Sequence, residues 1–299
     1  MKIRKAAPFL FLLLSACATG PRVQRSEPLA LPLAQHVDVE VRLTQHQIEV
    51  SYQPSVQGAA AGIQMAGSPA VAAGGFAAGA AAGLIGSLID TAVTAHRSNV
   101  AKEQQRPIQE RTSGLSIDEL IHRSLEGLDR ERIAGDIALV RLDRAERDDA
   151  KAKTLTVGSN ILVLTPRYSV SYDGSFFSYA LDVTLVDRAQ NAKGRLDSKV
   201  RYWQIFEYVL PREDAPGGTG WGELGAEQWT QVLEAAAAET VTMLNYDIGA
   251  NPSDALPRRR YHDQTVLLDQ ERGERSWVRN DFALLSVPTA RLTQKTQKK

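Results

Sequence analysis

Cysteine is nearly absent from this chain: Cys17 is the only one in 299 residues. A lone cysteine excludes an internal disulfide and any metal site that needs several thiolates. An excess of either charge is absent too, since 35 basic residues balance 35 acidic ones. Nucleic-acid binding depends on basic patches, so this balance predicts that nucleic acid is not the partner.

Catalytic and cofactor signatures are missing as well. The sequence contains no G-x-S-x-G turn for a serine nucleophile, no P-loop and no dinucleotide-binding fingerprint. Asp182 and Asp187 lie on or beside a predicted strand without an evident partner. No two of the five histidines have metal-ligand spacing on one element: these are His36, His46, His96, His122 and His262. We therefore predict a protein that is not an enzyme, with no metal site and no cofactor.

The N-terminus, in contrast, carries a strong signal. Three basic residues precede a short apolar run from Phe9 to Leu14, which is far below the roughly 20 residues that span a bilayer. The run has the proportions of a signal-peptide core and ends in Leu14-Ser15-Ala16-Cys17. This order of an aliphatic residue, two small residues and cysteine resembles the lipobox of bacterial lipoproteins. The alternative is an ordinary secretory signal with a chance cysteine.

The resemblance implies cleavage before Cys17, so that residues 1–16 are the signal peptide. It also implies a diacylglycerol group on the cysteine sulfur and a third acyl chain on the new N-terminal amine. Two or three acyl chains anchor a protein stably in a membrane. In these lipoproteins an aspartate directly after the cysteine favours retention in the inner membrane. Here that residue is Ala18, so the resemblance implies the outer membrane. We expect a periplasmic protein anchored there by lipid, with the proline-containing residues 17–36 as its tether.

No charged residue occurs between Val50 and Ile89. The second part of this stretch, AVAAGGFAAGAAAGLIGSLID at 70–90, is mostly alanine and predicts a helix that continues to about residue 105. Each of its glycines costs about 1 kcal/mol relative to alanine in an isolated helix, so such a helix needs a compensating contact. Small residues recur at intervals of four and share one face, where a second backbone can approach closely: Gly75, Gly79, Gly83 and Ser87.

This segment resembles the glycine zippers of some bacterial envelope lipoproteins. Residues 70–89 are long enough to cross a bilayer, but their hydrophobicity is marginal and no tryptophan or tyrosine flanks them. A linker would need polar residues. The composition therefore favours a helix packed against protein, another copy of the chain or the membrane surface over a membrane span.

The remaining chain predicts an α+β fold, because strand patterns neighbour one another instead of alternating with helices. Alternating residues at 37–43 and again at 48–52 predict a hairpin around the polar residues between them. Three further strands between 160 and 210 predict an antiparallel meander whose first turn is Asp173-Gly174. In its third strand, alternation places four residues on one face: Val200, Tyr202, Phe206 and Tyr208.

Two amphipathic helices complete the predicted body. The first covers about 116–133 and begins with a capping box from Ser116 to Glu119. The second covers about 223–247. The glycine-rich loop before it, Gly217–Gly222, is expected to be a plain connection, with a binding loop as the alternative.

These elements define a predicted domain at 37–250, which includes the Gly/Ala-rich helix 70–105. Residues 251–299 are expected to form a linker, a small β-hairpin and a disordered basic tail. The function that fits best is a structural or interaction module of the cell envelope, whose glycine-rich helix self-associates, meets an envelope protein or touches the membrane. The alternative is a subunit of an envelope transport or secretion assembly.

Overall fold

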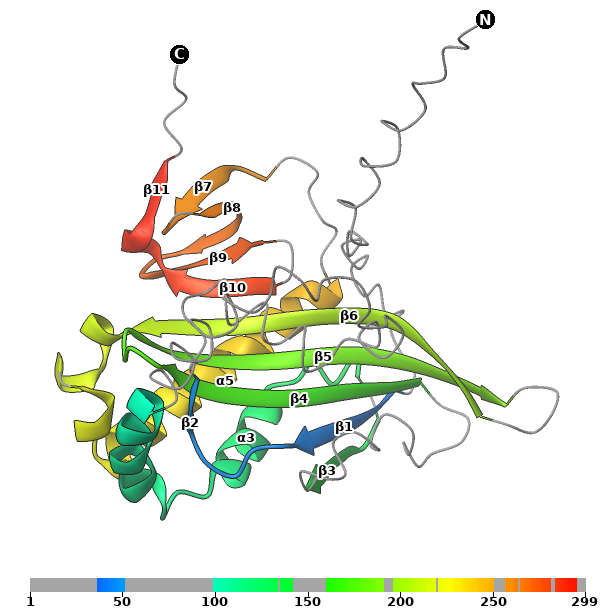
Figure 1. Ribbon diagram of the computed structural model, residues 1–299. Helices are drawn as coiled ribbons and strands as arrows, with labels where there is room; N and C mark the ends of the chain where they lie inside the picture. The colour runs from blue at the N-terminus through cyan, green and yellow to red at the C-terminus, as the bar shows by residue number, and fades with distance from the viewer. Residues whose placement is uncertain are drawn as a thin grey trace, which may run out of the picture.

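The computed structural model describes nine stretches of the chain: 37–51, 99–133, 135–141, 160–190, 196–218, 220–249, 256–262, 264–280 and 283–294. Within them the fold is α+β, as predicted: one mixed sheet of eleven strands with helices against one of its faces (Figure 1). The first six strands are β1 (Val37–Leu43), β2 (Glu49–Ser51), β3 (Ile137–Arg141), β4 (Asn160–Ser171), β5 (Phe176–Gln190) and β6 (Leu196–Pro211). The five C-terminal strands are β7 (Arg258–Tyr261), β8 (Gln264–Arg272), β9 (Arg275–Arg279), β10 (Ala283–Pro288) and β11 (Leu292–Gln294).

The antiparallel meander predicted between 160 and 210 is confirmed as β4, β5 and β6, which pair in sequence order. Gly174 adopts φ +67° in the first turn, a conformation that favours glycine. The prediction that Val200 shares a buried face with the other three residues of the third strand is wrong. A register shift after Leu185 places Arg201 in a bulge, so Val200 is 58% exposed while Tyr202 lies in the core.

The hairpin predicted at 37–52 is also wrong, although the buried face of its first strand is real. Both β1 and β2 pair with β4 in the parallel direction, so the chain continues along β4 instead of turning back. The polar segment between them bulges outward. There the Gln45 side chain accepts a hydrogen bond from the Tyr168 backbone N–H at 2.9 Å, which satisfies a donor that the interrupted strand leaves open.

Helices cover one face of the sheet. The long predicted helix is confirmed as α5 (Ala226–Gly249), which lies behind β4, β5 and β6 in Figure 1. The other is shorter than predicted: α3 spans Ile117–Leu125, and the Ser116 side chain forms no capping hydrogen bond. It ends early because Asn245 of α5 binds the backbone beyond it, donating to the Gly127 carbonyl and accepting from the Asp129 N–H.

A third helix is described over 99–112, which includes the last residues of the predicted helix 70–105. It continues through Pro107, although proline usually ends or kinks a helix. Proline removes one helical hydrogen bond, and here its ring packs closely against the loop before α5: a Cβ on Gly222 would lie 3.0 Å from the Pro107 Cγ. In the part of the chain that the structure covers, no helix is long and apolar enough to cross a membrane.

The strands alternate their side chains between two cores. The larger core lies between the sheet and the helices and contains Tyr202, Phe206 and Trp277. The smaller core lies on the opposite face and contains Ile205, Val209 and Val278. The C-terminal strands curl over this second face, and Tyr261 of β7 is buried in it (Figure 1). Both faces of β6 are therefore covered near its C-terminal end.

The C-terminal strands join the same sheet as the meander. β10 pairs with β6 in the parallel direction, and the full order is β11-β7-β8-β9-β10-β6-β5-β4-β1-β3. The predicted small hairpin is confirmed as β8 and β9. Arg258–Tyr261, expected in a linker, form β7, and Leu292–Gln294 form the edge strand β11. The sheet thus continues across the boundary predicted at residue 251.

Candidate functional site

The residues that the sequence singles out for function lie outside the described part of the chain: Cys17, Gly75, Gly79, Gly83 and Ser87. The described part of the body holds three clusters of buried and half-buried polar side chains. Their geometry decides whether they are available for chemistry or serve to join strands and helices.

The first cluster is centred on Arg279 of β9, which is 8% exposed. Its Nη2 donates a hydrogen bond to Asp247 Oδ1 of α5 at 2.6 Å, and its Nε donates to Asp269 of β8. Tyr202 of β6 donates its hydroxyl to the other oxygen of Asp247 at 2.6 Å. Tyr246 of α5 does the same for Asp269 at 2.7 Å. Together these hydrogen bonds tie α5 to the three strands β6, β8 and β9.

Electrostatics fix the charge state of this cluster. Burial alone would lower the pKa of Arg279, but the nearby carboxylates of Asp247 and Asp269 outweigh it and raise that pKa. Burial and the Asp247 charge together raise the pKa of Tyr202 well above its ordinary value. The arginine stays charged and the tyrosine stays neutral near pH 7. Neither is tuned for proton transfer, so the cluster joins elements.

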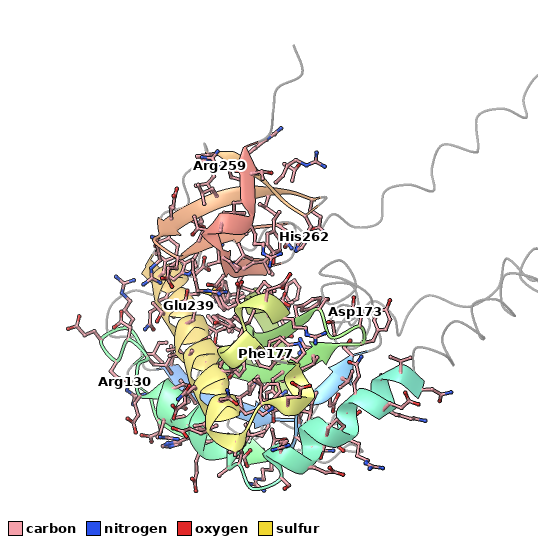
Figure 2. The ribbon with its side chains drawn as sticks, turned by 90° about the vertical axis from the view of Figure 1, so that its left-hand side faces the viewer. Arg130, Asp173, Phe177, Glu239, Arg259 and His262 are labelled. Atoms are coloured by element: carbon pink, nitrogen blue, oxygen red, sulfur yellow. The ribbon has the colours of Figure 1, made fainter. Side chains whose placement is uncertain are left out.

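The second cluster surrounds Glu239, on the side of α5 that faces β9 and β10 (Figure 2). Its Oε1 accepts hydrogen bonds from Trp277 Nε1 at 2.7 Å and from Ser286 Oγ at 2.8 Å. Arg275 donates its Nε to the same serine and its Nη2 to the Val209 carbonyl at 2.8 Å. Three of these hydrogen bonds link α5 or β6 to the C-terminal strands, and the bond from Arg275 to Ser286 joins β9 to β10.

The third cluster lies on the face of the meander opposite the helices. Asp182 of β5 accepts hydrogen bonds from Arg167 Nη2 and from Trp203 Nε1, each at 2.9 Å. The sequence showed no partner for this aspartate, and the two partners come from the neighbouring strands β4 and β6. Beside it, Glu207 is 1% exposed and accepts a hydrogen bond from Ser178 Oγ at 2.8 Å.

Burial raises the pKa of both carboxyls in this third cluster. For Asp182 the charge of Arg167 and the Trp203 hydrogen bond oppose the rise, and for Glu207 the Ser178 hydroxyl and Arg167 oppose it. Two acidic groups with raised pKa on adjacent strands are a pattern shared with general acid–base sites. The near-complete burial of Glu207 separates it from any substrate, so it acts within the fold.

The glycine-rich loop before α5 is anchored in the core. Trp221 is buried, donates its indole N–H to the Gly174 carbonyl at 2.9 Å and contacts Trp229 and Phe177. Gly217 and Gly218 adopt φ values of +79° and +63°, which provide the turns that bring the tryptophan inward. These contacts favour the plain connection over the binding loop.

Three of the five histidines fall in described stretches, and all three are exposed and lie on separate elements or loops: His46, His122 and His262. Within the described residues no group of three or more metal-ligating side chains comes together. No protein family, curated protein or solved structure matches this chain. The site therefore has to be judged from its own residues.

The buried clusters of Arg279 and Glu239 were not predicted, although the sequence contains a local signal for them. Arg275, Trp277 and Arg279 are spaced two residues apart, so their side chains lie on the same face of β9. The two arginines therefore share a face with a core residue. Asp247 stands three positions after the buried Leu244 and shares the apolar side of α5. Charged residues in phase with a core stripe indicate buried ion pairs.

Proposed function

We propose that this protein is a lipid-anchored outer-membrane lipoprotein whose α+β body acts as a structural or interaction module of the cell envelope and not as an enzyme. The observation that carries this proposal is the sequence Leu14-Ser15-Ala16-Cys17 directly after a basic and an apolar segment, with the cysteine unique in the chain. The ion pairs of the described body support the role of a rigid scaffold, since they bind α5 to the C-terminal strands.

Metabolic labelling with palmitate tests the anchor. We expect label in the wild-type protein and none in the Cys17→Ala variant, because the thiol that accepts the diacylglyceryl group is removed. The matched control is Ser15→Ala, which keeps a small residue in the same segment and should remain labelled. Equal absence of label in wild type and Cys17→Ala would show that the protein is not a lipoprotein.

The four-residue spacing of Gly75, Gly79 and Gly83 favours a second candidate, a subunit of an envelope transport or secretion assembly. Small residues in this spacing allow close helix–helix contact, which an oligomer would use. Sedimentation of the purified protein measures its mass. Leucines at Gly79 and Gly83 should reduce an oligomer to monomer, whereas leucines at Ala77 and Ala81, on the other side of the predicted helix, should not. A monomer before and after substitution would contradict self-association.

A further inference from the structure

β7 consists of three consecutive arginines followed by a tyrosine: Arg258, Arg259, Arg260 and Tyr261. It lies near the end of the sheet, between β8 and β11. Tyr261 is buried in the smaller core, whereas Arg258 and Arg260 are exposed on the opposite face of the strand. Figure 2 shows Arg259 at the end of the molecule remote from Arg130 and α3. We call Arg258, Arg259 and Arg260 the arginine strand.

The residues paired directly with the arginine strand offer it no compensating charge. Its partners on β8 are residues 264–267, and its partners on β11 are residues 292–294, all of them uncharged. Across the described residues no acidic side chain forms an ion pair with Arg258 or Arg260. Two other arginines of the C-terminal segment do have acidic partners: Arg279 pairs with two aspartates, and Arg291 pairs with Glu213 at 3.1 Å.

Protection of a sheet edge does not explain this charge. Charged side chains at an edge strand discourage pairing with another chain, but the edge strand here is β11, and β7 is hydrogen-bonded on both sides. The sequence adds three lysines directly after β11, at positions 295, 298 and 299. In a chain whose total charge is zero, the described residues thus place three consecutive arginines near this end of the sheet without an acidic ion-pair partner.

We propose that the arginine strand binds the phosphate groups of anionic phospholipids in the leaflet that holds the anchor. This proposal rests on the lipid anchor of the proposed function. Guanidinium groups form bidentate hydrogen bonds with phosphate, and a basic patch beside an acyl anchor supplies the second membrane signal of many anchored proteins. The contact would hold the body in one orientation on the membrane, with the C-terminal strands toward the lipid and α3 away from it.

The geometry of the anchor permits this contact. The arginine strand and β1, where the described chain begins, are separated by seven strand spacings, or at most about 34 Å at the usual spacing within a sheet. Residues 17–36 reach at most about 70 Å when fully extended. The chain between Cys17 and β1 is therefore long enough for the arginine strand to meet the leaflet.

The test uses the full protein extracted from the envelope and reconstituted into vesicles. Thr293, exposed beside Arg260, is replaced by cysteine and labelled with a fluorophore, since acylation leaves no other thiol. One vesicle set contains phosphatidylcholine only, and the other also contains phosphatidylglycerol; both carry the same small fraction of a headgroup-linked nitroxide quencher. Flotation with pure phosphatidylcholine vesicles reports the acyl anchor, and quenching reports the distance of β11 from the headgroups.

We expect stronger quenching with phosphatidylglycerol than without it, and loss of the difference in high salt. Arg258→Gln with Arg260→Gln should lower the docked-to-undocked ratio about 25-fold, because each arginine near an anionic surface contributes about a fivefold factor. Arg106→Gln with Arg111→Gln, on the exposed helix at 99–112, should leave the quenching unchanged.

Two results would overturn the proposal: equal quenching in both vesicle types, or quenching that the Arg258/Arg260 double substitution leaves unchanged. Binding of an acidic protein instead of lipid would give the first of these. Failure of the anchor gives a different result, because the protein would then not float with pure phosphatidylcholine. In that case flotation with phosphatidylglycerol vesicles, and its loss in the double variant, still decides whether the arginine strand binds anionic lipid.

Discussion

At the scale of single residues, Gly135 shows how closely two strands approach where the chain enters β3. A Cβ atom at this position would lie 2.1 Å from the Val37 carbonyl oxygen of β1. The neighbouring Asp136 carbonyl accepts a hydrogen bond from the Val39 N–H at 2.8 Å, so the two backbones cannot separate without loss of pairing.

We therefore expect Gly135→Ala to lower the free energy of unfolding by about 2–4 kcal/mol, since backbone must shift to admit the methyl group. Urea denaturation followed by circular dichroism measures the change. The matched control is Gly114→Ala, where a Cβ meets nothing within 4 Å, and the expected change is within about 0.5 kcal/mol. Equal stabilities for the two variants would contradict the close approach.

Glu207 is the residue that links stability to pH. In the unfolded chain its carboxyl titrates near the ordinary value of 4.5, and burial raises its pKa in the folded protein. Between these two values the folded state holds a proton that the unfolded state has released. Stability from this group is therefore present at low pH and declines as the pH rises through the raised pKa.

Glu207→Gln should remove this part of the pH dependence, because glutamine stays neutral and can still accept the Ser178 hydrogen bond. Within the titration window the wild type should lose up to about 1.4 kcal/mol of stability per pH unit relative to the variant. Denaturant midpoints between about pH 4 and pH 8 measure the difference. The control is Glu223→Gln, at an exposed position. If Glu207→Gln showed the same dependence of stability on pH as the wild type, another group would be responsible for it.

At the scale of elements, the Arg279 cluster couples α5 to the C-terminal strands. Removing the guanidinium leaves two buried carboxylates without a counter-charge. Breaking a buried ion pair on one side usually costs about 3–5 kcal/mol, whereas an exposed pair contributes little.

We expect Arg279→Met to lose stability in that range and Arg272→Met, on the turn of the same hairpin, to lose less than about 1 kcal/mol. Arg272 is a suitable control because 41% of its side chain is exposed and its nearest carboxylate oxygen, on Glu239, is 3.7 Å away. Chemical denaturation of the two variants decides between them. Similar losses would mean that the buried cluster does not hold α5.

Elements also show where sequence patterns succeed. The meander and α5 were predictable because each has a long period of alternating or helical apolar residues and a clear turn signal. The first two strands were mispaired because alternation reports the buried face of a strand and carries no information on the direction of its partner. β7 was missed because three arginines resemble a solvated linker, and only the burial of Tyr261 reveals a strand.

At the scale of the whole molecule, the parallel pairing of β10 with β6 makes the C-terminal strands part of the body. Residues 256–294 supply Trp277 to the larger core and complete the smaller one. A chain that ends at residue 250 would expose the β6 edge and leave Asp247 without Arg279.

We predict that this truncated chain shows no cooperative thermal unfolding and binds a hydrophobic dye, as loosely packed states do. The control is a chain that ends at residue 294, which removes only the lysine tail and should melt at the wild-type temperature. Circular dichroism and dye fluorescence measure both. A sharp transition in the chain ending at residue 250 would show that 37–250 folds alone, as the predicted boundary implies.

The sequence by itself determined the α+β class, the meander, α5 and the expectation of a lipid anchor at Cys17, because these depend on local periodicity and on short motifs read in order. Only the tertiary structure decided how the strands pair, which charges lie buried in pairs, and that Arg258 and Arg260 form no ion pair with an acidic side chain among the described residues. The reason is physical: pairing, burial and charge compensation are set by residues far apart in the chain, which a local pattern cannot bring together.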